Sequence, residues 1–149
     1  MMSCHDVAQY FLAQIDEDAG DLISNLKLQK LVYYAQGFAL ALNGRPLFAE
    51  RIEAWTHGPV VPDLYREFKG YGSDAIPFPS GFEFTDFDAK TRELLDEVYA
   101  TYGQFSAWKL RDMTHSEPPW RKTPAGEEIR HDDLSDFFAT RIIRGAETP

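Results

Sequence analysis

The longest regular pattern of apolar residues in the chain runs from residue 24 to residue 44. Apolar residues recur there at spacings of three and four, which is the period of an α-helix. They are Leu28, Leu31, Val32, Ala35, Ala39 and Leu42. Aromatic residues fill much of the remaining surface, as in a helix that other elements cover on several sides. Ser24 can cap its start and Asn43-Gly44 can end it, so the pattern predicts a buried central helix.

Five residues inside this helix need an explanation, because each is unfavourable at an apolar helical position. Gly37 costs about 1 kcal/mol relative to alanine, so we expect another backbone to pack closely against it. Lys27, Gln29, Lys30 and Gln36 must each reach solvent or a hydrogen-bond partner. They lie at the exposed end or form hydrogen bonds inside the protein; alternatively, they make a polar floor for a binding groove.

Shorter patterns predict further helices around the central one. Their expected extents are residues 3–15, a helix opening at Pro62, one capped by Thr85 or Asp86 and ending at Gly103, residues 106–116, and residues 133–144. The helix that opens at Pro62 is expected to bury Leu64, Tyr65 and Phe68. The Pro118-Pro119 pair is expected to end the fifth helix.

Two short segments alternate between apolar and polar residues, as β-strands do. They are residues 51–56, which the turn at Gly58-Pro59 follows, and residues 82–85. We expect the two to pair. The predicted fold is therefore mainly α (α+β): a compact bundle of about six helices around the central helix, with a small two- or three-stranded antiparallel β element. The chain shows no repeat and no shift in composition, so residues 1–149 are expected to form a single domain.

Charge and cysteine content exclude several classes of function. The 24 acidic and 15 basic side chains give a net charge of -9, which disfavours nucleic acid as a partner. Cys4 is the sole cysteine, so neither an internal disulfide nor a cysteine-based zinc site is expected. The continuous apolar part of the predicted central helix is shorter than the roughly 18–20 residues that a membrane span needs. With no signal peptide recognisable at the N-terminus, we expect a cytoplasmic protein.

The usual signatures of catalysis and cofactor binding are missing from the sequence. It has no glycine-rich dinucleotide loop and no G-x-S-x-G motif, and no two histidines have the helical spacing of a metal site. We therefore expect no cofactor, no metal and no catalytic residue. One enzymatic alternative stays open, in which His57 and His115 converge with Glu53 or Glu67 as an acid–base set.

Three ordered motifs point to a particular family. They are L-K-L-Q-K-L-V-Y-Y-A-Q-G-F at 26–38, P-L-F-A-E-R-I-E-A-W-T-H-G-P-V-V-P-D-L-Y at 46–65 and T-H-S-E-P-P-W at 114–120. Together with Tyr102-Gly103, they closely resemble the SocA-like antitoxin family, also called the Panacea domain. Most motif residues have a structural interpretation in the core or in turns. These residues are Leu28, Gln29, Lys30, Tyr34, Gln36, Gly37, Trp55, Gly58, Pro59, His115 and Trp120.

The resemblance implies an antitoxin without catalytic activity, whose partner is a cognate protein toxin. Members of the family neutralise a co-encoded toxin by direct binding, and the founding member resembles a factor that presents its toxin to an ATP-dependent protease. Relatives also occur in phages and prophages. A phage-derived adaptor without a toxin partner is therefore the third hypothesis, beside the antitoxin and the enzyme.

The sequence suggests one surface for binding the toxin. The proline-interrupted loop that carries Phe78, Phe82 and Phe84 is expected to lie next to Trp55 and His57. Exposed aromatic side chains anchor interfaces, and an unpaired strand edge there could accept a strand from the toxin. The alternative interpretation is that these phenylalanines cover the core from outside.

Overall fold

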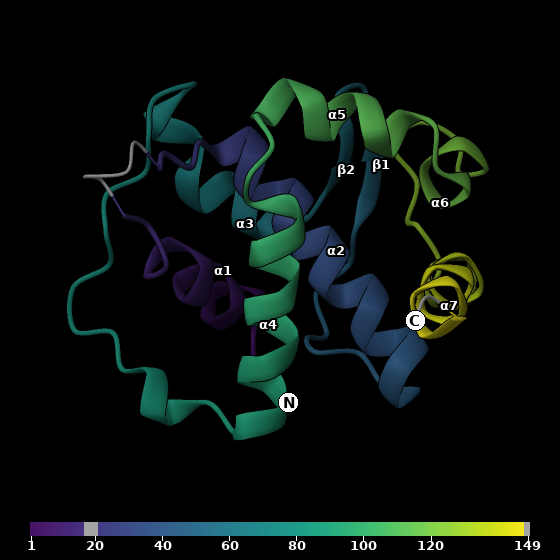
Figure 1. The fold of residues 1–149 in the computed structure, drawn as a ribbon. Helices are drawn as coiled ribbons and strands as arrows, with labels where there is room; N and C mark the ends of the chain where they lie inside the picture. The colour runs from purple at the N-terminus through teal and green to yellow at the C-terminus, as the bar shows by residue number, and fades with distance from the viewer. Residues whose placement is uncertain (17–20, 148–149) are drawn as a thin grey trace.

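The computed structural model describes residues 1–16 and 21–147, with side chains up to residue 142. Figure 1 shows helix α2 running through the middle of the molecule, with the other helices around it and a small hairpin at one side. The described helices are α1 (Cys4–Leu12), α2 (Asn25–Asn43), α3 (Pro62–Phe68), α4 (Ala89–Tyr102), α5 (Ala107–His115), α6 (Pro118–Arg121) and α7 (His131–Glu147). Strands β1 (Glu53–Trp55) and β2 (Gly58–Val60) and the short 3-10 helices η2 (Lys69–Tyr71) and η3 (Phe84–Asp86) complete the elements described. The predicted class, mainly α with a small antiparallel β element, is confirmed.

Helix α2 is the buried central helix that the apolar pattern predicts. Ser24 caps it by accepting a hydrogen bond from the backbone N–H of Lys27 (3.3 Å). Gly44 ends it in the left-handed conformation (φ 70°), and its N–H donates to the carbonyl of Leu40 (2.9 Å). Leu42, which the pattern places among the core residues, is instead 54% exposed, because the last turn of α2 extends beyond the core.

Gly37 lies in the middle of α2 because a side chain needs the space. A Cβ atom at this position would lie 2.8 Å from Cζ of Phe138 in α7, and closer still to other atoms of that ring. The Phe138 ring is fully buried and also contacts the rings of Tyr33 and Phe38. The expectation that another backbone approaches Gly37 is therefore wrong: the close neighbour is an aromatic ring.

The two glutamines of α2 hold surrounding loops by their backbones. Gln36 Oε1 accepts from the N–H of Leu47 (2.8 Å), and its Nε2 donates to the carbonyl of Phe48 (2.9 Å). Gln29 Oε1 accepts from the N–H of Val61 (2.8 Å). Both side chains are buried, so hydrogen bonding within the protein satisfies them, as one of the two interpretations expects.

The two lysines of α2 are also buried and also bind main-chain groups. Lys30 Nζ donates to the carbonyl of Pro59 (3.1 Å), and Lys27 Nζ donates to the carbonyl of Gly103 (2.6 Å). Neither amine reaches solvent at an exposed helix end. These bonds explain why the motif keeps polar residues on an otherwise apolar helix: they connect α2 to the hairpin and to the end of α4.

Burial of the Lys30 amine predicts a measurable dependence of stability on pH. Burial, with a smaller effect of the nearby charge of Arg111, lowers the pKa of Lys30 from 10.5 to about 7. The unfolded chain therefore binds more protons than the folded chain between these values, so stability rises with pH in this window. We expect the free energy of unfolding to rise by about 2 kcal/mol from pH 7 to pH 9 through this residue.

Urea unfolding at both pH values tests this expectation. In Lys30→Met the increase should disappear, whereas the surface variant Lys109→Met should keep it. An unchanged pH dependence in Lys30→Met would contradict the assignment. The comparison concerns the slope with pH, because loss of the hydrogen bond to Pro59 lowers the stability of Lys30→Met at both values.

The β element is a tight hairpin, and not the predicted pair of distant segments. Strand β1 pairs antiparallel with β2 in the register Glu53↔Val60, Ala54↔Pro59 and Trp55↔Gly58. The prediction that residues 82–85 form the second strand is wrong, since that segment leads into η3. Closing the two-residue loop between β1 and β2 costs less entropy than closing the loop of residues 56–81 that the predicted pairing needs.

Both outer edges of this hairpin are occupied. On the side of β1, Ala54 exchanges backbone hydrogen bonds with residues 126 and 127 (2.7 and 3.0 Å). On the side of β2, the Lys30 and Gln29 side chains bond the carbonyl of Pro59 and the N–H of Val61. The hairpin therefore offers no free edge at these positions to a strand from another protein.

Several helix boundaries differ from the prediction: α1 ends at Leu12 and not at residue 15, and α7 begins at His131 and not at residue 133. The N-cap of α4 is Asp88, whose carboxylate accepts from the N–H of Thr91 (2.7 Å), and not Thr85 or Asp86. The Pro118-Pro119 pair begins the short helix α6, where proline fits because the first helical turn needs no N–H donors.

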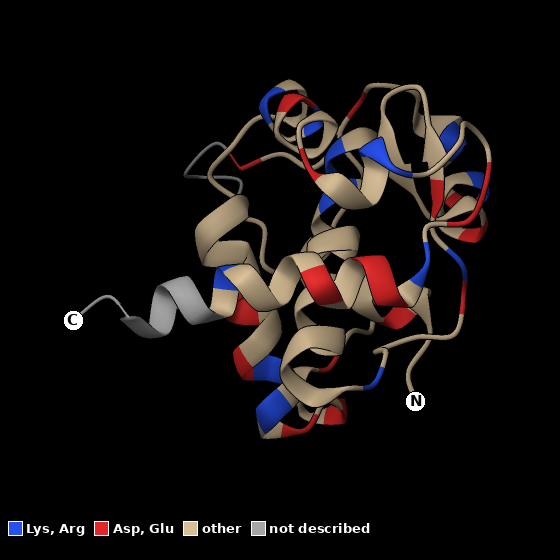
Figure 2. Ribbon diagram, turned by 90° about the vertical axis from the view of Figure 1, so that its right-hand side faces the viewer, with Lys and Arg blue, Asp and Glu red and all other residues tan. Residues whose placement is uncertain are grey.

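Figure 2 looks onto α7, whose first turns carry acidic residues near the positive end of the helix dipole.

Candidate functional site

An aromatic groove of about 640 Å³ lies where the start of α2, the hairpin, α3, η2 and α5 meet. Its aromatic residues are Trp55, Tyr65 and Trp108. Trp108 is 58% exposed and Tyr65 is 37% exposed, so the expectation that α3 buries Tyr65 is wrong. The rings of Trp55 and Tyr65 meet edge to face at 5.0 Å between centroids.

Hydrogen bonds fix the walls of the aromatic groove. Trp55 donates from Nε1 to Glu53 Oε1 (2.9 Å), and its carbonyl accepts from Nε1 of Trp120 (2.8 Å). The Asn25 side chain at the start of α2 donates to the carbonyl of Tyr65 (3.4 Å). These bonds join β1 to α6 and the start of α2 to α3 beside the groove.

Two basic side chains lie at the aromatic groove, Lys69 in its lining and Arg111 against the Trp108 ring. His57 Nδ1 accepts from Nε of Arg111 (3.0 Å), and the Arg111 guanidinium lies 4.7 Å from the centre of the Trp108 ring. Lys69 of η2 lines the groove and is exposed, whereas Arg111 also pairs with Asp112 (3.1 Å). Fifteen residues line the groove and none of them is Asp or Glu, although the chain has 24 acidic side chains. The groove is thus an aromatic surface whose lining contains the exposed Lys69 and no acidic residue.

A buried carboxylate connects α2 to the region of α6. Glu117 is 6% exposed, and its two oxygens accept from the hydroxyls of Tyr33 and Tyr34 (2.8 Å each). The Tyr34 ring also stacks on Tyr102 at 3.8 Å. Burial raises the pKa of the Glu117 carboxyl and of both hydroxyls. Because both oxygens already have partners inside the protein, this cluster holds the fold together.

The acid–base set considered from the sequence is not assembled in the described residues. His57 bonds Arg111, whereas His115 stacks on Trp120 at 4.1 Å and burial lowers its pKa. Both carboxylates have other partners. Glu53 bonds Trp55 and Arg51, and Glu67 bonds His5 (2.7 Å).

In residues 1–16 and 21–147, no three His, Cys, Asp or Glu side chains gather as metal ligands. Among the described helices, none is both long and apolar enough to cross a membrane.

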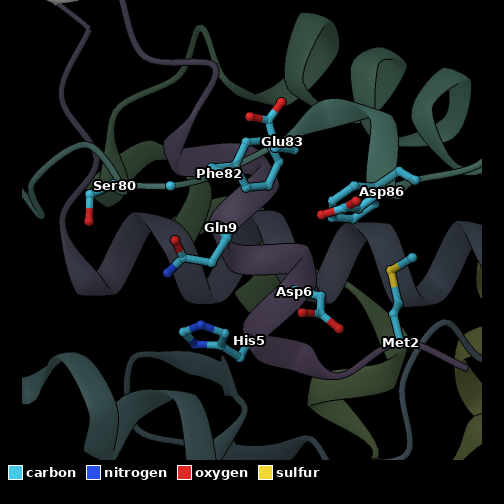
Figure 3. A pocket seen from close by; sticks show the side chains of 10 residues that line it. Met2, His5, Asp6, Gln9, Ser80, Phe82, Glu83 and Asp86 are labelled. Atoms are coloured by element: carbon cyan, nitrogen blue, oxygen red, sulfur yellow. The ribbon is translucent and has the colours of Figure 1, made fainter.

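The predicted toxin-binding residues lie in two separate places. Trp55 and His57 line the aromatic groove, but Phe82 and Phe84 pack edge-on against Tyr10 of α1. Phe82 also lines a smaller pocket of about 320 Å³, where it faces Asp6 and Gln9 of α1 (Figure 3). The structure therefore does not bring the two groups together, and covering the core is what Phe82 and Phe84 do.

Phe78 lies in the same proline-interrupted loop as Phe82 and Phe84, and its side chain is 55% exposed. Trp108, Tyr65 and Lys69 were not among the predicted site residues. A signal for Trp108 exists in the sequence: Leu110 and Thr114 form the buried side of α5, and Trp108 lies two residues before Leu110, on the other side of the helix.

Known proteins match this chain over the region that carries the three motifs. The family model described as antitoxin SocA-like, Panacea domain, matches residues 28–121, which run from α2 to α6. Antitoxin SocA of Caulobacter vibrioides (strain NA1000 / CB15N) is 38% identical over 109 residues, which cover 66% of this chain and 58% of that protein. The chain thus spans less than two thirds of that relative's length. No solved structure matches. Because the family model covers well over half of the chain, the chain belongs to the SocA-like antitoxin family with a Panacea domain.

Proposed function

We propose that this chain is a cytoplasmic antitoxin that neutralises a co-encoded protein toxin by direct binding. The observation that carries the proposal is the family match over residues 28–121, together with a relative named an antitoxin. That matched region includes the hairpin and α5, and therefore most of the aromatic groove. The proposal treats residues 1–149 as one binding domain without catalysis.

In this proposal the buried motif residues maintain the fold, and the outer surface of the domain binds the toxin. Motif residues such as Gln29, Lys30 and Gln36 point inward and bond the backbone of neighbouring loops. They preserve the fold and leave the outer surface free to differ between relatives that bind different toxins. The net charge of -9 would speed the encounter with a basic toxin. Binding occludes the toxin's own working surface.

Co-expression with the product of the adjacent gene tests the proposal. We expect that product to stop growth when it is expressed alone, and growth to recover when this chain is co-expressed. The two proteins should then co-purify as a complex. A neighbour that is harmless alone, or the absence of a complex, would contradict the antitoxin role and favour the adaptor without a toxin.

We further propose that the bound toxin is handed to an ATP-dependent protease, as the resemblance to the family's founding member suggests. The toxin's half-life after translation is stopped should then shorten only when this chain and the protease are both present. A half-life that is independent of the protease would end this second proposal and leave neutralisation by binding intact.

A further inference from the structure

We propose that the aromatic groove receives a toxin segment that carries a bulky apolar side chain next to a carboxylate. This inference rests on the proposed antitoxin function and names the chemistry of the bound segment. Three properties of the groove support it: its exposed aromatic rings, a lining that contains an exposed lysine and no acidic residue, and the closed edges of its hairpin.

The exposed aromatic rings favour an apolar side chain as the occupant. Trp108 is 58% exposed and lines the same depression of about 640 Å³ as Trp55 and Tyr65. A depression of this size accommodates a few side chains. Tryptophan and tyrosine dominate binding energy when a partner covers them, because they bury a large apolar area and lose little conformational entropy.

The charges around the aromatic groove favour a carboxylate beside that apolar side chain. Lys69 lines the groove and is exposed, and the Arg111 guanidinium, which is paired with Asp112 (3.1 Å), lies 4.7 Å from the centre of the Trp108 ring. The nearest acidic group of the hairpin, Glu53, is already bound to Arg51 and Trp55. An exposed lysine in a lining that contains no acidic residue matches an acidic group on the partner, although the chain as a whole has a net charge of -9.

The closed hairpin edges decide how the segment binds. Residues 126–127 cover one edge, and Lys30 and Gln29 satisfy the backbone groups at the other. Addition of a toxin strand to this sheet would have to break those bonds. Insertion of side chains between Trp55, Tyr65 and Trp108 breaks none, so the groove recognises side chains.

Affinity measurements on the complex with the adjacent gene's product test this inference. By isothermal titration calorimetry, Trp108→Ala should weaken binding at least about 30-fold, as expected for a central aromatic anchor. Lys69→Glu should weaken binding about 10-fold, more at low salt than at high salt, and Lys69→Gln should weaken it less. All three changes are at exposed positions, so circular dichroism should show an unchanged fold.

Phe78→Ala is the matched control, because Phe78 is 55% exposed but lies outside the aromatic groove. Its affinity should stay within twofold of the original. If the toxin binds the unchanged chain and also binds Trp108→Ala and Lys69→Glu equally well, this inference is overturned while the antitoxin function stands. A loss confined to Phe78→Ala would also overturn it. If the unchanged chain binds nothing, the proposed function itself fails.

Discussion

Glu117→Ala is expected to lower the free energy of unfolding by about 4 kcal/mol, because it leaves two buried hydroxyls without a partner. The hydroxyls of Tyr33 and Tyr34 each donate to one oxygen of this carboxylate (2.8 Å), and both tyrosines are fully buried. Each unpaired buried donor costs about 1–3 kcal/mol, and the cavity left by the missing side chain adds to the loss. Urea unfolding at pH 7 measures the difference.

Two further variants make this expectation specific. Glu117→Gln keeps the shape and one acceptor oxygen, so it should cost about 1–2 kcal/mol. Glu93→Ala removes an exposed glutamate of α4 and should change stability by less than about 0.5 kcal/mol. Equal stability of Glu117→Ala and Glu93→Ala would show that the tyrosine–glutamate cluster contributes nothing to the fold.

The same carboxylate should make stability depend on pH in the acid range. Burial raises the pKa of Glu117 above 4.5, so the folded chain holds this proton more readily than the unfolded chain. Its contribution is therefore present in full below pH 4.5 and is lost as the pH rises through the folded-state pKa. Relative to Glu117→Gln, the original chain should gain stability as the pH falls from 7 toward 4.5.

The sequence was sufficient to predict the elements whose information is local. The period of α2, its cap at Ser24 and its end at Gly44 are all encoded within the helix, and all are confirmed. The partner of β1 is encoded less clearly. The Gly58-Pro59 pair indicates a turn after the strand, yet these residues are themselves in β2 and the turn consists of Thr56 and His57. Proline fits this strand position because Lys30 binds the Pro59 carbonyl, so this contact does not need a backbone N–H at residue 59.

The aromatic groove could be predicted only in part. Trp55 and His57 are in a motif, so the sequence draws attention to them. Trp108 and Lys69 reach the groove through the packing of α5 and η2 around α2, which no local pattern specifies. The amphipathic pattern of α5 could have identified Trp108 as exposed, but only the fold places it beside Trp55.

Gly37→Ala is expected to destabilise the protein by about 3 kcal/mol, although alanine is intrinsically the better helix former by about 1 kcal/mol. The new methyl group would lie well inside contact distance of the Phe138 ring. That ring cannot move cheaply, because Tyr33, Tyr34 and Phe38 surround it (5.5, 5.9 and 4.8 Å between ring centroids). The clash therefore separates α2 from α7, the helix that it contacts most, and thermal and urea unfolding both report the loss.

A second substitution should restore part of this loss, since the steric explanation requires it. Phe138→Leu alone removes ring contacts and should cost about 1–2 kcal/mol, but it also frees space opposite residue 37. The double variant should therefore be more stable than the sum of the two single losses predicts, by about 1–3 kcal/mol. Gly70→Ala is the control, because nothing lies within 4 Å of a Cβ atom there and it should be neutral or slightly stabilising. Strict additivity of the two core changes would mean that the Phe138 ring is not what excludes a side chain at residue 37.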